Sequence, residues 1–423
     1  MKVKIKKIDF DKVASLPPKK QVKPKKCRWY WRWLLNIISF PELAKVRFKS
    51  TKIGMEKLPK KQPCLILMNH CSSIDLQIAA TIMGSRPVNI VCTIDSLLGK
   101  DWLMRQIGCI PTDKFVKEVQ IVRDIYYALH TLKTSVVMFP EAGYSIDGKA
   151  SLLPESVGKL IKLLKVPVVM ITTFGAYTRD PLYSCLKITK GDVSAQVKYL
   201  LSQEDVEAKS VQELNQIVGK EFDFDYYNWQ KENKVAVKSK NRAYGLNKVL
   251  YKCPNCLQEG NMHAEGTTLK CLDCGKEYQL TEYGELQALN GQTEYSHIPD
   301  WSAWEREQVK KELLDGSYKV DIPVKIGIIK NTKCLYMVGN GRLVHDLNGF
   351  ELTGCDGKLH YIHTPLATHS IVADFFFYET EDMVCIGDKE LLYFCYPEDQ
   401  SIDIVYKMRL AHEELYKIKK GLN

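Results

Sequence analysis

A histidine and a carboxylate stand five positions apart in the stretch Asn69-His70-Cys71-Ser72-Ser73-Ile74-Asp75. The apolar run Cys64–Met68 before them predicts a buried strand, and Leu76–Met83 after them predicts a helix that ends at Gly84. The histidine therefore lies on a strand-to-helix loop, where α/β proteins commonly place chemistry. Held there by the carboxylate, it can act as a general base near neutral pH.

The same stretch also allows a purely structural interpretation. Ser72 or Ser73 could cap the helix, and Asp75 in the first turn would favour the helix dipole. These residues alone favour that interpretation, and the choice depends on the rest of the chain.

A second junction of this kind carries a glutamate. The strand predicted at Ser135–Phe139 runs directly into Pro140-Glu141-Ala142-Gly143-Tyr144-Ser145. Together the two junctions resemble the phospholipid and glycerol acyltransferase family, whose first block is N-H-x4-D and whose third is F-P-E-G-T-R-S. The second and fourth blocks of that family, G-x-x-F-I-D-R and V-P-V-V-P, are similar to Gly108–Lys114 and Val166–Met170. The blocks come in the family's order; the first matches fully and the others in part.

The resemblance implies an O-acyltransferase of the 1-acylglycerol-3-phosphate type, on an α/β sheet flanked by helices. Its acyl donor would be acyl-CoA or acyl carrier protein, and its acceptor the hydroxyl of a lysophospholipid or related glycerolipid. His70 would take the hydroxyl proton, while Asp75 would orient the imidazole and stabilise the imidazolium. The motif positions assign substrate binding to Asn69, Asp113, Lys114, Glu141 and Tyr144.

The sequence departs from the family where acceptor recognition is expected. Family arginines thought to hold a substrate phosphate are replaced here by Lys114 and Tyr144. Lysine keeps the charge but loses the bidentate fork, and tyrosine keeps neither. We therefore expect a neutral or phosphodiester lysolipid to be a better acceptor than a phosphate monoester. The alternative is that Lys114 binds the phosphate together with another lysine, such as Lys149 or Lys159.

Four cysteines are spaced as metal ligands. Cys253 and Cys256 form one CxxC pair and Cys271 and Cys274 another, with fourteen residues between the pairs. Such pairs place four thiolates around one zinc ion, as in a zinc ribbon, and leave no position open for water. The sequence thus predicts a structural zinc, with His263 as an exposed loop residue. The module carries little excess charge, so we expect a spacer or protein-docking unit, with nucleic acid an unlikely partner.

The net charge of +10 is concentrated at the N-terminus. Residues 1–35 contain twelve Lys and Arg against two Asp, so the rest of the chain is neutral in sum. This basic arm runs into Arg28-Trp29-Tyr30-Trp31-Arg32-Trp33, which suits a membrane surface with anionic lipid, since indole and phenol rings straddle headgroups and acyl chains. Two alternatives stay open: a basic arm for nucleic acid, and a helix that packs its tryptophans on the protein's own core.

Composition and pattern divide the 423 residues into four parts. These are a basic arm with an interfacial aromatic segment (1–44), an acyltransferase domain (45–225), a linker with the zinc ribbon (226–292) and a β-rich C-terminal domain (293–423). In the second part, strand candidates alternate with helical ones. In the fourth, short apolar runs, a turn at Gly339-Asn340-Gly341 and a final helix at Ile404–Lys420 predict a small β-sandwich or barrel with a terminal helix. The clearest strand candidates are Cys64–Met68, Val88–Thr93, Ser135–Phe139, Val168–Thr172, Val324–Ile329, Cys334–Val338 and Ala373–Tyr378.

Cysteine usage and hydropathy indicate the cellular setting. Ten of the fourteen cysteines are scattered singly, which is typical of a reducing compartment. There is no uncharged apolar run of about 18 residues and no visible cleavable signal sequence. We therefore expect a cytoplasmic protein, peripheral on the inner face of the membrane. The main alternative is a non-catalytic membrane or nucleic-acid scaffold on a degenerate acyltransferase fold; a weaker one is a thioesterase that uses water as acceptor.

Overall fold

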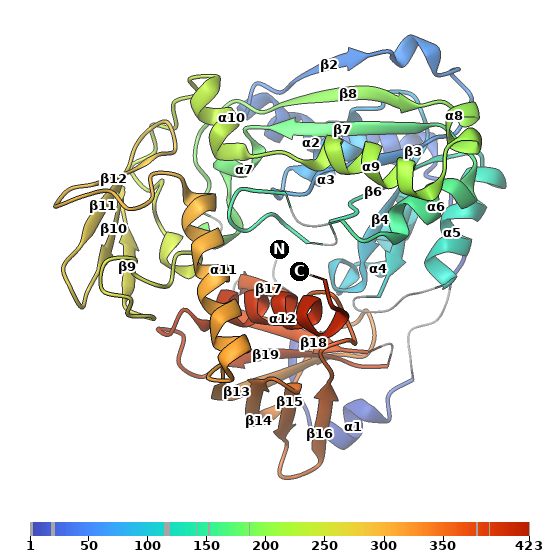
Figure 1. The fold of residues 1–423 in the computed structure, drawn as a ribbon. Helices are drawn as coiled ribbons and strands as arrows, with labels where there is room; N and C mark the ends of the chain where they lie inside the picture. The colour runs from blue at the N-terminus through green and yellow to red at the C-terminus, as the bar shows by residue number, and fades with distance from the viewer. Residues whose placement is uncertain are drawn as a thin grey trace.

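The computed structural model describes residues 3–17, 22–113, 119–141, 143–150, 153–185, 187–377, 380–388 and 390–422. Within these residues the framework consists of sheets with seven, four and eight strands. The seven-stranded sheet and its helices form one side of the molecule and the eight-stranded sheet the other, with the four-stranded sheet at the flank (Figure 1). The expected fold class, an α/β sheet with a small cysteine module and a β-rich C-terminal domain, is confirmed.

The seven-stranded sheet has the order β2-β8-β7-β3-β6-β4-β5. Every neighbouring pair is parallel except β7 with β8. Its central strand β3 is completely buried, which explains why the sequence shows a continuous apolar run there instead of alternation. The strands are β2 Lys49–Ile53, β3 Leu65–Met68, β4 Val88–Thr93, β5 Cys109–Thr112, β6 Ser135–Met138, β7 Val168–Phe174 and β8 Ser194–Leu201.

Helices cover both faces of this sheet. Leu65 and Leu67 of β3 pack with α5, α6 and α9, whereas Ile66 and Met68 belong to the core that includes α3 on the opposite face. The carboxyl ends of β3, β4, β5 and β6 lie at one edge because these strands are parallel, so the loops that follow them meet there. The helices of this region are α2 Trp29–Lys45, α3 Asp75–Thr81, α4 Asp101–Gln106, α5 Val119–His130, α6 Ser156–Leu164, α7 Ala176–Arg179, α8 Gln203–Ala208, α9 Val211–Phe222 and α10 Tyr226–Glu232, with short 3-10 turns η1 Met55–Lys57, η2 Ile94–Leu97, η3 Leu182–Ser184 and η4 Leu246–Lys248.

The four-stranded sheet is antiparallel throughout, in the order β12-β11-β10-β9. It contains the segment between the two cysteine pairs. Tyr278 in β11 packs edge-on against Trp301 of α11, with ring centroids 5.0 Å apart, so this small sheet is fixed to the following helix. The strands are β9 Met262–Glu265, β10 Thr268–Cys271, β11 Glu277–Leu280 and β12 Leu286–Ala288.

The C-terminal region is a single sheet, so the expected sandwich or barrel is wrong. Its order is β16-β15-β14-β13-β19-β18-β17, and the end strands β16 and β17 are not paired with each other in the described part of the chain. Helix α12 packs against β17 and β18, and α11 packs along α12, so helices replace the second sheet as cover for the apolar face. The elements are α11 Ile298–Asp315, β13 Val320–Ile329, β14 Leu335–Asp346, β15 Gly349–Gly354, β16 Leu359–His363, β17 Val372–Phe377, β18 Glu381–Gly387, β19 Leu392–Pro397 and α12 Ile404–Lys420.

The turn expected at Gly339-Asn340-Gly341 is also wrong, because these residues lie inside β14 and pair with β13. Gly341 allows close strand approach instead, whereas Gly339 has a φ of +140°, which favours glycine. A Cβ on Gly341 would lie 2.2 Å from the carbonyl oxygen of Thr353 in β15, a distance that no side chain can occupy. Glycine within a strand commonly marks a place where a second backbone approaches closely.

Part of the N-terminal arm belongs to the C-terminal sheet. Strand β1 (Ile5–Lys7) pairs in parallel with Leu335–Met337, the portion of β14 that β15 does not reach. Helix α1 (Phe10–Ala14) follows and places Val13, which is fully buried, in the core. This pairing was not predictable from the sequence, because the lysine-rich arm lacks the apolar alternation of a strand and was expected to face a membrane.

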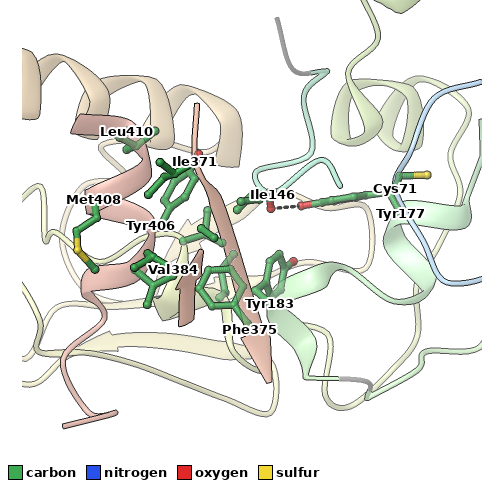
Figure 2. Close-up of a cluster of buried hydrophobic side chains, with 14 of the residues drawn as sticks. Cys71, Ile146, Tyr177, Tyr183, Ile371, Phe375, Val384, Tyr406, Met408 and Leu410 are labelled. Atoms are coloured by element: carbon green, nitrogen blue, oxygen red, sulfur yellow. Dashed lines mark hydrogen bonds between the residues drawn. The ribbon is translucent and has the colours of Figure 1, made fainter. Parts of the chain in front are cut away.

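The α/β region and the C-terminal region share one hydrophobic core. Figure 2 shows Ile146, Tyr177 and Tyr183 of the α/β region close to Phe375 and Tyr406 of the C-terminal region. All five side chains are less than a tenth exposed. The C-terminal sheet is therefore packed directly against the region that carries the His70 loop.

Candidate active site

His70 and Asp75 form a direct pair on the loop between β3 and α3. The Nδ1 atom of His70 lies 3.0 Å from Oδ2 of Asp75, whose side chain is completely buried, while the histidine side chain is 22% exposed. With Nδ1 engaged by the carboxylate, Nε2 is the ring nitrogen left to accept a proton from a substrate. The structure thus brings together the two residues that the sequence assigned to catalysis.

The loop backbone holds the Asp75 carboxylate in place. The amide groups of Cys71 and Ser72 donate hydrogen bonds to Oδ2 over 2.8 Å and 3.0 Å. Hydrogen bonds to a carboxylate are stronger than those between neutral groups, so these two amides fix the position of the Asp75 side chain beside the ring. Four residues lie between His70 and Asp75, so the loop can turn back on itself. As a result, the two backbone amides and the His70 ring all contact Oδ2 of Asp75.

The serines of this loop do not cap helix α3. Its N-cap residue, Ile74, has no side-chain cap. The hydroxyls of Ser72 and Ser73 instead donate to the two carboxylate oxygens of Asp180, the latter over 2.5 Å. The capping interpretation of this stretch therefore fails, because the serine hydroxyls serve a long-range contact.

Asp180 connects the His70 loop to helix α2. Its Oδ2 lies 3.4 Å from Nη1 of Arg179, and Nη2 of Arg179 lies 3.2 Å from Oε1 of Glu42 in α2. Arg179 and Asp180 are both less than a tenth exposed. Burial raises the pKa of Asp180, and the serine hydroxyls and Arg179 oppose that effect. Sequence reasoning missed this connection, since nothing local marks an Arg-Asp pair after β7 as part of a site.

Two aromatic rings enclose the imidazole of His70. The ring of Phe139 stacks on it with centroids 4.3 Å apart, and the ring of Tyr144 does so at 4.0 Å. Burial, followed by the nearby carboxylates of Asp75 and Asp374, raises the pKa of the Tyr144 phenol. Tyr144 is thus a neutral aromatic group stacked on the His70 ring. The sequence predicted a substrate-binding residue at this position, and that role stays a prediction.

Glu141 contacts the backbone of the histidine rather than its ring. Its Oε1 accepts a hydrogen bond of 3.0 Å from the His70 amide, and its side chain is buried. In the opposite direction, the Ser145 amide donates to the His70 carbonyl oxygen over 2.9 Å. The loop after β6 therefore fixes the main chain of His70 from both sides.

The other residues assigned to substrate binding lie in different settings. Asn69 is buried and joins β3 to β7, because its Oδ1 accepts from the Thr173 amide over 2.9 Å and its Nδ2 lies 2.5 Å from the Tyr226 hydroxyl. Asp113 is partly buried directly after β5, at the same edge of the sheet as His70. Lys114, like Ala142 of the third block, lies outside the described residues.

The Cys71 thiol beside the pair is not activated as a nucleophile. Burial, together with the charge of Asp75, raises the pKa of the thiol well above its ordinary range. A thiol kept protonated reacts poorly, since the thiolate is the nucleophilic form. The geometry therefore favours direct attack by a substrate hydroxyl over an acyl-cysteine intermediate.

The four cysteines of the small module converge on one point. All four sulfur atoms lie within 4.8 Å of one another, with Cys253 and Cys274 separated by 3.8 Å and Cys256 and Cys271 by 3.7 Å. In a tetrahedron with Zn–S bonds of about 2.3 Å, the sulfurs are about 3.8 Å apart. The sulfur positions thus fit a tetrahedral zinc ion. His263, expected in a loop, lies on β9 with an exposed side chain and is not part of the cluster.

Comparison with known proteins agrees with the motif analysis. Residues 49–173 match the family model described as Acyltransferase. Among solved structures, the 1-acyl-sn-glycerophosphate (LPA) acyltransferase PlsC from Thermotoga maritima is similar at 18% sequence identity, covering 45% of this chain and 76% of that chain with a TM-score of 0.35. A TM-score this low does not establish a common fold. No curated protein matches the chain.

The family match ends before the cysteine module and the C-terminal sheet. It does include both loops described above, with His70 and Asp75 after β3 and Glu141 and Tyr144 after β6. The similarity to the acyltransferase family therefore concerns residues 49–173 and the two loops within them.

Proposed function

We propose that the protein is a glycerolipid O-acyltransferase in which His70 is the general base and Asp75 its orienting partner. The contact of 3.0 Å between His70 Nδ1 and the buried Asp75 carboxylate is the observation that carries the proposal. A scaffold that had lost catalysis would have no need to keep a buried charge paired with a partly exposed imidazole, because a buried charge is costly to maintain.

The reaction consists of direct attack by the acceptor hydroxyl on an acyl thioester. As the new C–O bond forms, Nε2 of His70 takes the hydroxyl proton, and the C–S bond then breaks to release a thiolate, which the imidazolium protonates. Asp75 stabilises the imidazolium while it exists. General-base assistance of this kind contributes about 10²- to 10⁴-fold to the rate.

The acyl donor is acyl-CoA or acyl carrier protein, and the acceptor is a lysophospholipid or related glycerolipid. Tyr144 supports an acceptor without a phosphate monoester, because its ring covers the imidazole and offers one neutral hydroxyl where a phosphate needs charged donors. Glu141 and Asp113 would bind or order the acceptor from the same edge of the sheet, and Lys114 would contribute its positive charge.

The protein reaches its lipid substrates through helix α2. The described residues include no helix long and apolar enough to cross a membrane. However, the side chains of Trp29, Trp33, Ile38 and Phe40 on α2 are between 62% and 75% exposed, a large apolar surface for a protein in water. This observation disfavours the alternative in which the tryptophans pack on the protein's own core.

Helix α4 extends the same surface. Trp102 is 66% exposed, and its ring meets that of Trp31 on α2 edge-on, with centroids 5.9 Å apart. Basic residues of the N-terminal segment adjoin these aromatic groups, a combination that favours a bilayer with anionic lipid over an apolar protein partner. Since α2 also holds Glu42, which contacts Arg179, the membrane helix lies close to the catalytic loop.

The cysteine cluster would hold a structural zinc ion that maintains the small sheet. Cys253, Cys256, Cys271 and Cys274 supply all four ligands, so the ion has no open position for substrate. The outer surface of this module or of the C-terminal sheet is available for a protein partner.

A donor and acceptor screen tests the function. Purified protein is incubated with vesicles, radiolabelled acyl-CoA or acyl carrier protein, and a panel of lysolipids, and the lipid products are separated. We expect a labelled diacyl product with the parent and with Cys71→Ala, but none with His70→Ala. Binding to vesicles without product would indicate the scaffold instead, and release of free fatty acid as the main product would indicate a thioesterase.

A further inference from the structure

The loop after β6 has two ends, and only one of them is at the catalytic pair. Residues 143–150 carry Tyr144, whose ring stacks on His70, and Ser145, whose amide donates to the His70 carbonyl oxygen over 2.9 Å. The position of this short loop therefore decides how the imidazole is enclosed.

The other end of the loop is held by the C-terminal region. Oδ2 of Asp147 accepts a hydrogen bond of 3.0 Å from Ser302 of α11 and lies 3.5 Å from the Tyr406 hydroxyl of α12. The two hydroxyls are 2.9 Å apart, so the three groups contact one another. Ser302 and Tyr406 are both buried, whereas Asp147 is partly buried. Removing these hydroxyls would leave the Asp147 carboxylate without its hydrogen-bond donors from α11 and α12, which has a cost in free energy.

The two helices that supply these hydroxyls are fixed to each other. Arg306 of α11 forms ion pairs with Glu413 and Glu414 of α12, at 2.8 Å and 3.0 Å. Both carboxylates are largely buried, so salt screens their attraction to Arg306 less than it screens a surface ion pair. Ser302 and Tyr406 therefore present a rigid pair of donors to the loop.

Packing supports the same contact. Figure 2 shows Ile146 between Tyr177 of the α/β region and Tyr406 of α12, and the Tyr177 hydroxyl donates to the Ile146 carbonyl oxygen over 2.9 Å. Gly148 has a φ of +90°, and a Cβ there would lie 2.6 Å from the ring of Tyr227. The loop between Tyr144 and Lys149 is thus packed between the α/β region and α12, and both restrict its position.

We propose that the C-terminal region is a working part of the active site, in which Ser302 and Tyr406 are positioning residues. By holding Asp147, they set the loop that places Tyr144 against His70 and Glu141 against the His70 amide. Neither residue touches the reacting atoms. The catalytic unit is then larger than the matched family domain, since α11 and α12 lie far beyond residue 173. The effect on turnover rests on the proposed acyltransferase function, whereas the effect on the loop does not.

The test compares Ser302→Ala, Tyr406→Phe and the double variant with the parent in two assays. The first is hydrogen–deuterium exchange of the amides in 143–150, and the second is kcat/KM for the acceptor. Tyr251→Phe is the matched control, because Tyr251 is a buried tyrosine whose hydroxyl has no hydrogen-bond partner within the described residues. Circular dichroism and zinc content show whether each variant is folded.

We expect roughly tenfold faster exchange at Ser145 and its neighbours in the double variant, and at least a tenfold loss of kcat/KM for the acceptor, since small misplacements of catalytic groups are costly. The donor KM should stay within twofold. Because a general loss of folded protein would also leave the donor KM unchanged, the variants are compared at equal concentrations of folded protein. The loss must then appear in kcat or in the acceptor KM. Tyr251→Phe should match the parent in both assays. Parental exchange in a folded double variant would overturn the inference. Faster exchange in a chain without acyltransferase activity would keep the loop contact and reject the proposed function instead.

Discussion

Three buried histidines make the C-terminal region sensitive to acid. His345, His363 and His412 are each no more than 1% exposed and lie on β14, β16 and α12. Their rings are close, with centroids 5.4 Å apart for His363 and His412 and 5.9 Å apart for His345 and His412. Lowering the pH is therefore a direct perturbation of this core.

The magnitude follows from the pKa of each ring. Burial lowers the pKa of His363 and of His412 from 6.5 to about 4, with the neighbouring histidine adding to the effect on His412. Burial also lowers the pKa of His345 well below its ordinary value. Because the unfolded chain binds protons at a higher pH than the folded chain, stability is present in full above about pH 6.5 and is lost as the pH falls toward 4. At about pH 5, His363 and His412 should each cost about 2 kcal/mol of unfolding free energy relative to about pH 7.5.

Other buried groups act in the opposite direction, so the assay must isolate the histidines. Burial raises the pKa of Asp403 to about 6. Because the folded state then binds this proton more readily than the unfolded chain, Asp403 adds to the stability of the folded protein as the pH falls. We therefore compare the parent with His412→Gln, whose amide can replace the ring Nε2 contact to Thr368 but does not titrate. Urea unfolding at several pH values gives the free energy of each.

The parent should lose about 2 kcal/mol more than His412→Gln between about pH 7.5 and about pH 5, since the contribution of Asp403 cancels in the difference. If α12 positions the Asp147 loop as proposed, acceptor turnover should fall over the same pH range and recover on neutralisation. Parallel pH dependences for parent and variant would refute the reasoning, because the ring of His412 would then titrate as freely in the folded protein as in the unfolded chain.

The remaining predictions concern the metal, the membrane, the acceptor and the link to α2. Metal analysis should find one zinc per chain, and the zinc should be lost when Cys253 and Cys271 are both changed to Ser. That variant should also show local unfolding of the small sheet and loosening of α11 through Trp301. An iron–sulfur absorption spectrum from anaerobically purified protein would rule out zinc. The double variant Trp29→Ala and Trp33→Ala should sediment less with anionic vesicles than the parent, most clearly at low salt. Leu314→Ala changes a similarly exposed apolar residue on α11 and should sediment like the parent. If the tryptophan variant and the Leu314 variant sedimented equally, the membrane contact would lie elsewhere. The parent should prefer neutral or diester lysolipids to lysophosphatidic acid, and Tyr144→Arg should gain on the latter; a strong parental preference for lysophosphatidic acid contradicts our view of this site. Asp180→Asn should lower kcat at least tenfold with the donor KM unchanged, because Ser72 and Ser73 lose a charged partner; parental kcat in a folded variant would show that this contact does not position the loop.

Deleting the N-terminal arm is a poor test of membrane binding. Such a deletion removes β1 and α1 together with the basic residues, and both elements pack on the C-terminal sheet. A weaker signal with vesicles would then have two causes. Substitutions on the exposed face of α2 avoid this difficulty because those side chains make few internal contacts.

Local patterns were sufficient to predict the elements that bury continuous apolar runs. Strand β4 and helix α12 have the predicted bounds, and β3 and β6 each differ from prediction by one residue at an end. These elements are set by short-range periodicity and by the breaks that end them. The convergence of the four cysteines was likewise predictable, because their spacing leaves few other arrangements.

Contacts between distant segments were beyond the reach of the sequence. No local signal pairs Asp180 with Ser72, Asp147 with Tyr406, or the basic Ile5–Lys7 with β14, because each partner is an ordinary polar or charged residue in its own surroundings. Gly341 in β14 was wrongly predicted to lie in a turn for the same reason. A turn and a close strand approach both favour glycine, and only the position of β15 distinguishes them.

The most direct test of the central claim is single-turnover acyl transfer by the parent and by His70→Ala, with the preferred donor and lysolipid at saturating concentration. Our proposal assigns proton removal to the His70 imidazole, whose Nδ1 lies 3.0 Å from the buried Asp75 carboxylate. We expect the transfer rate of His70→Ala to fall by about 10²- to 10⁴-fold, with unchanged fold, zinc content and vesicle binding. Transfer by His70→Ala at the parental rate would contradict it.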